Sequence, residues 1–471
     1  MISKRSLSRA RKINQFYAND LSFLNPELLS REAVLRLLPR LVISRTITRN
    51  FDVTPALFGD TIQIPRPGTF KMTRKDGVCD VITTQDISGD RIQARLDQWP
   101  QVAFKICDGE SRSVPDLLEQ QLNPAVQALA EGIDYIVSGQ IHRFYAGPIA
   151  GHLGGMSPDT VNDYILDVWE QMNAANVPDD NRFLSLTGNT VASGLKNDLF
   201  VRADQSGSSD ALRRADLGQL YSFRLFNPSN QPRVLAGQPT TTAAVNNAGG
   251  YAAGTTAVTY DGIASGPFVV GGWVTVAGDD APQHITAASG TVLTLSPGLR
   301  RGVADNAVIT GIVGGAVNNA LGYRGRDNTS GKPGYAKEIT VDGFTSAPKI
   351  GQGVTFGTQT EVYSIIGVNG VVGITLDRPL ELAIADNALV NLMPAGQYNM
   401  AYRPNAFALI VRPLAPAITN AGVLSRTFSY GGFTVRVTIG YDINEQAHKV
   451  VLDLLCGINI IDSNQVMPMY G

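Results

Sequence analysis

The chain has 471 residues, of which 44% are hydrophobic and 17% are charged. At about 150 residues per domain, this length allows two or three domains, and the formal net charge of -2 argues against a dedicated nucleic-acid binder, which usually has a strong basic excess. Soluble domains have about 25% charged residues on average, so the low charge suits a surface that neighbouring molecules mostly cover.

The three cysteines, Cys79, Cys107 and Cys456, are scattered and form no CxxC pair. We therefore expect neither a disulfide framework nor a zinc site, and a reducing cytosol as the compartment. The basic N-terminus is not followed by an apolar segment, so no signal peptide is expected. No apolar run approaches the ~20 residues that a membrane-spanning helix needs.

Residues 1–50 are rich in arginine and leucine and are predicted to be helical. Asn25-Pro26-Glu27 has the pattern of a helix N-cap followed by proline. The residues after it fit an exposed arm or an arm that lies on another chain, with one face formed by Leu28, Leu29, Ala33, Leu37 and Leu38. DNA phosphates or acidic residues of a neighbour could bind the basic cluster of Lys4, Arg5, Arg9, Arg11 and Lys12.

Residues 51–110 change to a period of two. Residues 60–65 and 92–97 alternate and flank a polar, glycine-containing stretch, which predicts a long hairpin with a mobile tip. A two-stranded hairpin has little core of its own, so it should lie on something else. Residues 102–106 predict a further strand.

Helical periodicity is strongest between residues 111 and 146. Ser113 before Pro115-Asp116 is a start signal, and Pro124 should kink or break this helix. The repeating apolar residues are Leu117, Leu118, Leu122, Val126, Leu129, Ile133, Ile136, Val137 and Ile141.

A second helix is predicted at about 157–176, before a strand at 182–186 and a short helix near 189–197. Together with the first helix and the hairpin, these elements indicate an α+β fold. One side of the second helix carries Val161, Ile165, Val168, Trp169 and Met172.

Residues 236–395 are rich in Gly, Ala, Thr and Val and contain an internal repeat. The offset between the copies is 81 residues, or 80 in one block. Short strands between Gly, Asp and Asn turns predict two small β-barrels or sandwiches in tandem. The matching blocks are 258–263 with 339–344, 274–276 with 354–356, 293–295 with 374–376, and 303–307 with 384–388.

The last part of the chain returns to α+β character. Residues 405–411 predict a buried strand, and residues 433–439 an alternating strand that turns at 440–445. Residues 449–455 lead into 457–461, which we predict to be the last strand.

We find no catalytic, cofactor-binding or metal-binding constellation, and no GxSxG, P-loop or GxGxxG motif. Asp179-Asp180 and Asp279-Asp280 read as turn residues, because neighbours on a strand point to opposite faces. Asn328-Thr329-Ser330 is a formal glycosylation sequon that a cytosolic bacterial product would not use. Surface or loop positions, with no HExxH pattern, are predicted for His142, His152, His284 and His448.

The order of these parts resembles the Hong Kong 97-type capsid fold of tailed bacteriophages. That fold has an N-terminal arm, a long extended hairpin loop, a spine helix in a peripheral domain, and an axial domain. The chain is more closely similar to the coat proteins of short-tailed phages that carry a β-barrel insertion in the axial domain. The residues that carry this resemblance are 104–106, 182–184, 211–215, 405–409, 412–414 and 452–458.

The resemblance implies a division of the chain, with one departure: the branch usually carries one insertion module, and this chain has two. The implied parts are an arm (1–50), an extended hairpin and peripheral strand (51–110), a spine helix (111–150), a first axial part (151–235), a first insertion module (236–317), a linker (318–335), a second module (336–395), an axial return (396–425) and C-terminal peripheral strands (426–471).

The function implied by the resemblance is that of a major capsid protein, not an enzyme, which assembles with itself as hexamers and pentamers into an icosahedral virion shell in the host bacterial cytoplasm. Scaffolding, portal and decoration proteins and non-specifically bound DNA are the implied partners, with no cofactor and no membrane. The lysine–asparagine crosslink of some family members finds no marked partner here, although Lys71 and Lys75 lie on the loop.

Two other functions stay open. One is a bacterial nanocompartment shell, which uses the same fold to enclose enzymes. The other is a carbohydrate-binding adhesin, because glycine-rich β-modules are frequent in secreted proteins.

Overall fold

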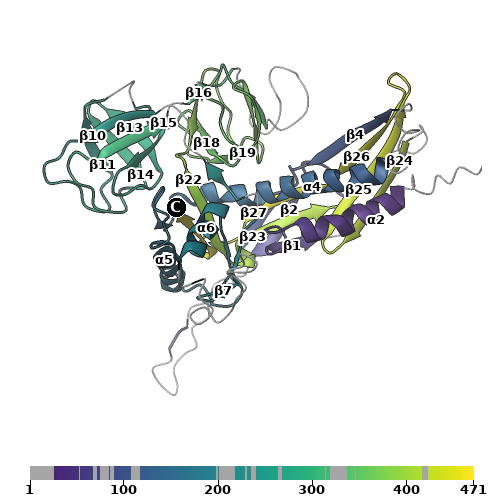
Figure 1. Cartoon of the computed structure of the whole chain (residues 1–471), viewed down its shortest axis with the longest axis horizontal. Coiled ribbons are helices and arrows are strands. Elements are labelled where there is room, and N and C mark those ends of the chain that lie inside the picture. Colours follow the sequence, from purple (N-terminus) through teal and green to yellow (C-terminus); the bar gives the residue numbers. More distant parts are fainter. Residues whose placement is uncertain are drawn as a thin grey trace, which may run out of the picture.

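The computed structural model confirms a mixed helix and sheet architecture (Figure 1). Several sequence predictions lie outside the residues it describes: the basic cluster, the signal at 113–116, the segment 211–215, the sequon, Lys71, Lys75 and Cys79. It describes residues 26–51, 54–66, 72–74, 84, 90–107, 117–197, 200, 218–228, 231–234, 240–263, 268–312, 314–318, 337–344, 346–415 and 423–471.

The longest helix, α4 (Leu117–Ser138), continues into a 3-10 helix, η3 (Gly139–Phe144). Pro124 does not break α4, contrary to one expectation. It lies on the exposed face, while its neighbours Ala125 and Val126 are buried in the main core, so packing compensates for the lost hydrogen bond.

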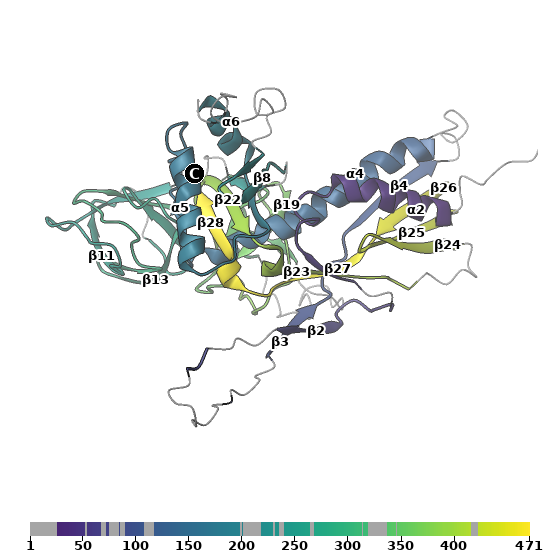
Figure 2. The ribbon, with the colours of Figure 1, turned by 90° about the horizontal axis from the view of Figure 1, so that it is seen from below.

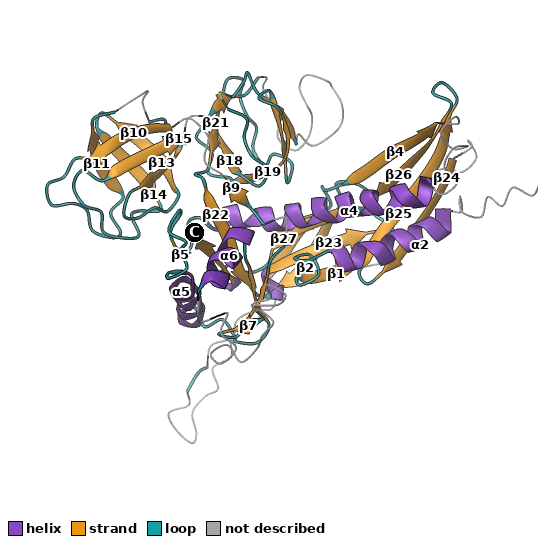
Figure 3. Ribbon diagram, in the orientation of Figure 1, coloured by secondary structure: helices purple, strands orange, loops and turns teal. Residues whose placement is uncertain are grey.

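A second helix, α2 (Pro26–Leu37), runs beside α4, and both cover a four-stranded sheet (Figure 3). The helix begins at proline as predicted, but Leu28 is 58% exposed, whereas Val34 is fully buried. The strands follow the order β24 (Val423–Tyr430), β25 (Phe433–Asp442), β26 (Ala447–Asp453) and β4 (Gln101–Cys107). Strand β25 continues through residues 440–442, where the sequence predicted a turn.

The segment after α2 is fixed to α4 by one buried carboxylate. Asp134 accepts hydrogen bonds from the backbone N–H groups of Val42 (2.8 Å) and Ser44 (3.0 Å) and from the Ser44 hydroxyl. Burial raises the pKa of Asp134, and the Ser44 hydroxyl and the backbone donors oppose this. The expectation of an arm that extends from the subunit therefore differs from the structure at residues 26–47, which pack within the chain's own core.

At the other end of α4 lies a mixed sheet, covered by α5 (Val161–Ala174) and α6 (Gly188–Lys196). Trp169 of α5 is 38% exposed and lies away from the predicted buried side. The sequence prediction missed β28, the true last strand. The strand order is β5 (Ala150–Gly151), β28 (Val466–Tyr470), β22 (Gly396–Tyr402), β6 (Arg182–Ser185), β8 (Phe223–Phe226) and β7 (Gln219–Leu220), with β9 (Arg233–Val234) also paired to β22.

Between the two sheets, a three-stranded sheet joins β1 (Thr48–Phe51), β23 (Phe407–Arg412) and β27 (Leu455–Ile460). Beside it, the predicted hairpin forms from β2 (Thr61–Arg66) and β3 (Asp90–Arg95), which are antiparallel. Figure 2 shows this hairpin leaving the body.

The repeat region forms two β-units, which lie next to each other at the η3 end of α4 (Figure 1). The first β-unit is a closed barrel of β10 (Thr240–Val245), β11 (Ala257–Asp261), β12 (Trp273–Val276), β13 (Gln283–Ser289), β14 (Val292–Ser296) and β15 (Val308–Ile312). The second β-unit comprises β16 (Gly315–Ala316), β17 (Glu338–Thr340), β18 (Gly353–Phe356), β19 (Tyr363–Asn369), β20 (Gly373–Leu376) and β21 (Leu389–Leu392).

The two β-units have the same strand neighbours. A bridge between Val317 and Val341 joins the ends of the second sheet, which makes its cyclic order the same as that of the barrel. The β-bulge after Ile285 recurs after Ile365. Both units also hold an asparagine at positive φ, Asn306 and Asn387, and each amide donates a 2.9 Å hydrogen bond to the preceding aspartate.

Candidate functional site

The structure contradicts the predicted surface or loop position for two of the four histidines, His142 and His284. His142 and His284 are buried, and burial lowers the pKa of both, that of His142 to about 4. His152 is half-buried, with Nδ1 4.0 Å from an Asp280 carboxylate oxygen, and His448 packs on Tyr441. Among the described residues, no group of three or more His, Cys, Asp or Glu side chains could hold a metal ion.

The paired aspartates lie in turns as predicted, but they bind specific groups. Asp179 forms an ion pair with the buried Arg182 (2.9 Å). Both carboxylate oxygens of Asp180 accept hydrogen bonds from Arg403 Nη2. Asp279 is buried and accepts hydrogen bonds from the backbone N–H groups of Arg300 and Arg301. Burial raises the pKa of Asp279. These contacts hold loops together and give no acid/base pair.

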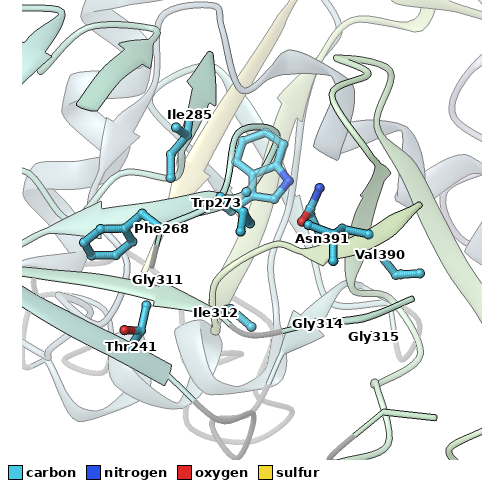
Figure 4. Close-up of a pocket in the computed structure, with 13 residues that line it drawn as sticks. Thr241, Phe268, Trp273, Ile285, Gly311, Ile312, Gly314, Gly315, Val390 and Asn391 are labelled. Carbon is cyan, nitrogen blue, oxygen red and sulfur yellow. The ribbon is translucent and has the colours of Figure 1, made fainter. Parts of the chain in front are cut away.

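Trp273 lies where the first β-unit and the second β-unit meet the end of η3. Its indole Nε1 donates a 3.0 Å hydrogen bond to Thr355 Oγ1 in the second unit. Its ring meets the edge of Tyr145, directly after η3, at a centroid distance of 4.8 Å. Figure 4 shows Trp273 beside a small, largely apolar cavity of about 100 Å³, to which Phe268 of the first unit and Asn391 of the second also contribute.

The second β-unit binds η3 through a separate set of buried polar contacts. His142 Nε2 lies 2.7 Å from the Gly351 carbonyl oxygen, and Gln140 Nε2 donates to Asp377 (2.9 Å). The other Asp377 oxygen accepts from the backbone N–H of Ser364. Both β-units are therefore docked through specific buried contacts and are not attached by the polypeptide alone.

A polar cavity of about 190 Å³ separates the first β-unit from α5. Arg300 closes one side and donates a 2.5 Å hydrogen bond to the Tyr145 carbonyl oxygen. Asp167, Gln171, Asp279 and Arg301 also line this cavity, so its positive and negative side chains are balanced.

Both described strands of the hairpin contact the body. Ala94 and Leu96 pack with Ile410, Leu414 and Leu455 in a small cluster of their own, and Ile62 and Ile64 pack against it. Leu57, just before the hairpin, is 71% exposed, and Met72, between its two strands in the sequence, is 95% exposed. Little that is described in this subunit covers these two apolar side chains.

These features provide interaction surfaces and rigid joints but no catalytic arrangement. The sequence analysis missed Trp273, although the repeat contains a signal: the second copy has Gly353 at the equivalent position, so the tryptophan belongs to one copy alone. Among the described residues, no helix is both long and apolar enough to cross a membrane.

No protein-family model matches the sequence, and no curated protein matches it. The structure is similar to that of Mycobacterium phage Che8, with a TM-score of 0.40, 11% identity, and coverage of 87% of this chain and 84% of that one. It is similar to the capsid of cyanophage P-SCSP1u (TM-score 0.42, 10% identity, 91% and 88% coverage). The third match is the mature capsid of bacteriophage PhiM1 (TM-score 0.40, 8% identity, 90% and 85% coverage).

Proposed function

We propose that this chain is the major capsid protein of a tailed double-stranded DNA bacteriophage, with the Hong Kong 97-type fold and a duplicated β-insertion. In this proposal α4 is the spine helix, the sheet β24–β25–β26–β4 belongs to the peripheral domain, and the sheet at the opposite end of α4 belongs to the axial domain. The two β-units, which lie between β9 and β22 in the chain, would be insertions in that axial domain.

The hairpin is the observation that carries this proposal. Strands β2 and β3 pair with each other and with no other described strand. Within the described residues the hairpin is anchored by a small cluster separate from the main core, and a two-stranded hairpin has little core of its own. A neighbouring subunit that supports the hairpin would supply the missing burial and would link identical chains into a shell.

The hydrophobic effect would drive this assembly, spread over several contacts on each subunit. We propose hexamers and pentamers that close into an icosahedral virion shell around DNA, built in the host cytoplasm with scaffolding and portal proteins. We propose no catalytic role for the chain. The docking of both β-units onto the spine end supports a role in stiffening the subunit.

Electron microscopy of the purified full-length protein tests this proposal. Closed shells of uniform size, with hexameric and pentameric units, are the expected result. A monodisperse monomer that binds glycans would instead support an adhesin. Shells that enclose host enzymes and no nucleic acid would support a nanocompartment.

A further inference from the structure

The two β-units are joined so that one end of the first unit docks on the side of the second. The end of the first unit, formed by residues 268–273, lies against the outer side of β16, β21 and β18 in the second. The contact is close: a Cβ atom on Gly271 would lie 1.7 Å from the Gly357 carbonyl oxygen. Glycine is required at that position because its φ is also +90°.

The second unit uses the equivalent end to dock on the body. Gly351, the counterpart of Gly271, has φ +88° and offers its carbonyl oxygen to His142 Nε2. A Cβ atom on Gly353, the counterpart of Trp273, would lie 2.3 Å from the Met393 sulfur and 3.0 Å from His142. The same end of the β-unit is therefore a docking end in both copies.

Within the described residues, the side that receives the docking end is more deeply buried in the second unit than in the first. In that unit Thr355 pairs with Asn391, and both are buried. Their counterparts in the first unit, Thr275 and Thr310, also pair with each other and are half-buried. Thr242 extends this row on β10 through its own pairing with Thr310.

This threonine row belongs to an uncharged outer face of β10, β15 and β12. Thr275 preserves the hydroxyl that accepts the Trp273 indole N–H in the second unit. Val308, beside the row, is 48% exposed, and strands β10, β12 and β15 contain no charged residue. The face is chemically suited to the same kind of docking end, and its threonines are half-buried where their counterparts Thr355 and Asn391 are buried.

We propose that this threonine face receives the end of a third β-unit, which is carried by a separate polypeptide. The partner would present a turn that contains a glycine, as at Gly271. An aromatic side chain with an N–H donor would follow it, as Trp273 does. A second copy of this chain cannot offer such an end, because both of its docking ends are occupied internally. Because the docking end of one unit binds the side of the next, each added unit would again offer a side to which another docking end can bind. The inference does not depend on shell assembly.

A chain with three β-units tests the proposal directly. Residues 240–313 are duplicated, and the added copy is spliced to Thr242. By strand pairing Thr242 is the counterpart of Gly314, where the first unit enters the second, because Ala243 pairs with Ile309 as Gly315 pairs with Val390. Short tethering gives the added unit a high effective concentration. The readout is maleimide labelling of Thr275→Cys in the original first unit, in a background with Cys79→Ser and Cys107→Ser.

In the intact two-unit chain, Thr275→Cys should react readily, whereas in the three-unit chain labelling should slow at least tenfold. Trp273→Ala in the added copy alone should restore the fast rate, which separates specific docking from crowding. Equal labelling rates in the two- and three-unit chains would overturn the proposal.

A second variant needs no added unit. Thr310→Arg in the ordinary two-unit chain should leave its melting temperature within about a degree of the parent, because Thr310 is only half-buried on the outer side of β15. The matched change Asn391→Arg, on the covered face of the second unit, should lower the melting temperature clearly. A large fall for Thr310→Arg would show that the subunit itself already uses this face and would also overturn the proposal.

Discussion

The Trp273 indole donates a 3.0 Å hydrogen bond to Thr355, a residue 82 positions further along the chain. This bond joins the two copies of the repeat at equivalent strands, β12 and β18. Trp273 itself belongs to the main core of the subunit and not to the core of its own barrel. Trp273 is thus the large apolar side chain of the first β-unit that packs into the body, beside the polar contacts of Arg300 and Asp280.

Trp273→Phe should lower the stability of the subunit modestly, because the ring still packs on Tyr145 while the N–H donor is lost. A typical hydrogen bond contributes about 1 kcal/mol. Trp273→Ala should cost roughly 3–5 kcal/mol, since it also leaves a cavity. Melting temperatures of the two variants check this order. Once Thr355→Val is present, Trp273→Phe should have less effect; full additivity would contradict the shared bond.

Acid should weaken the docking of the second β-unit through His142. Its pKa is about 4 in the folded chain against 6.5 for a free histidine, because burial disfavours the charged form. Between these values the unfolded chain binds a proton that the folded chain does not, so stability falls as the pH drops from 6.5 to 4. The loss amounts to about 3 kcal/mol in total.

The variant His142→Gln isolates this effect, because glutamine keeps an N–H donor for the Gly351 carbonyl without titrating. Melting temperatures measured from pH 7 to pH 4 should fall less steeply in the variant than in the parent. His284 is shifted in the same direction and stays present in both chains, so the difference reports on His142. Identical pH profiles would contradict the assignment.

Periodicity predicted those elements whose burial is one-sided. The amphipathic pattern of α4 and the alternation of β2 and β3 appear directly in the sequence. Strand β28 was missed because all five of its residues are buried, so it does not alternate, and it contains Pro468, which normally argues against a strand within a sheet. Its position depends on pairing with β22, almost seventy residues earlier.

The buried polar contacts that join distant elements could not be predicted, for a related reason. His142 looked like a loop residue because its partner, Gly351, lies 209 positions away. The role of Asp134 likewise depends on Val42 and Ser44, which meet it only when α2 packs beside α4. Sequence patterns describe what each element buries, whereas these contacts depend on which elements become neighbours.

Pro124→Ala should stabilise the subunit. Proline in a helix interior is about 3 kcal/mol less favourable than alanine, and this one is exposed, so no core contact is lost. Asn123→Ala, on the same exposed face, is the matched control, with an expected gain of a few tenths of a kcal/mol. Melting temperatures should rise more for Pro124→Ala. A fall would mean that packing of α4 requires the proline geometry.

Shortening the hairpin should abolish shell formation without unfolding the subunit. Arg66 and Asp90 are paired, so replacing residues 67–89 by Asn-Gly closes the hairpin with a favoured two-residue turn. The base cluster around Ala94 and Leu96 remains, and the melting temperature should stay close to that of the parent subunit. Sedimentation and electron microscopy should then find subunits or small oligomers in place of closed shells. Normal shells from the shortened chain would show that the hairpin does not link neighbours, and the proposed function would lose its main support.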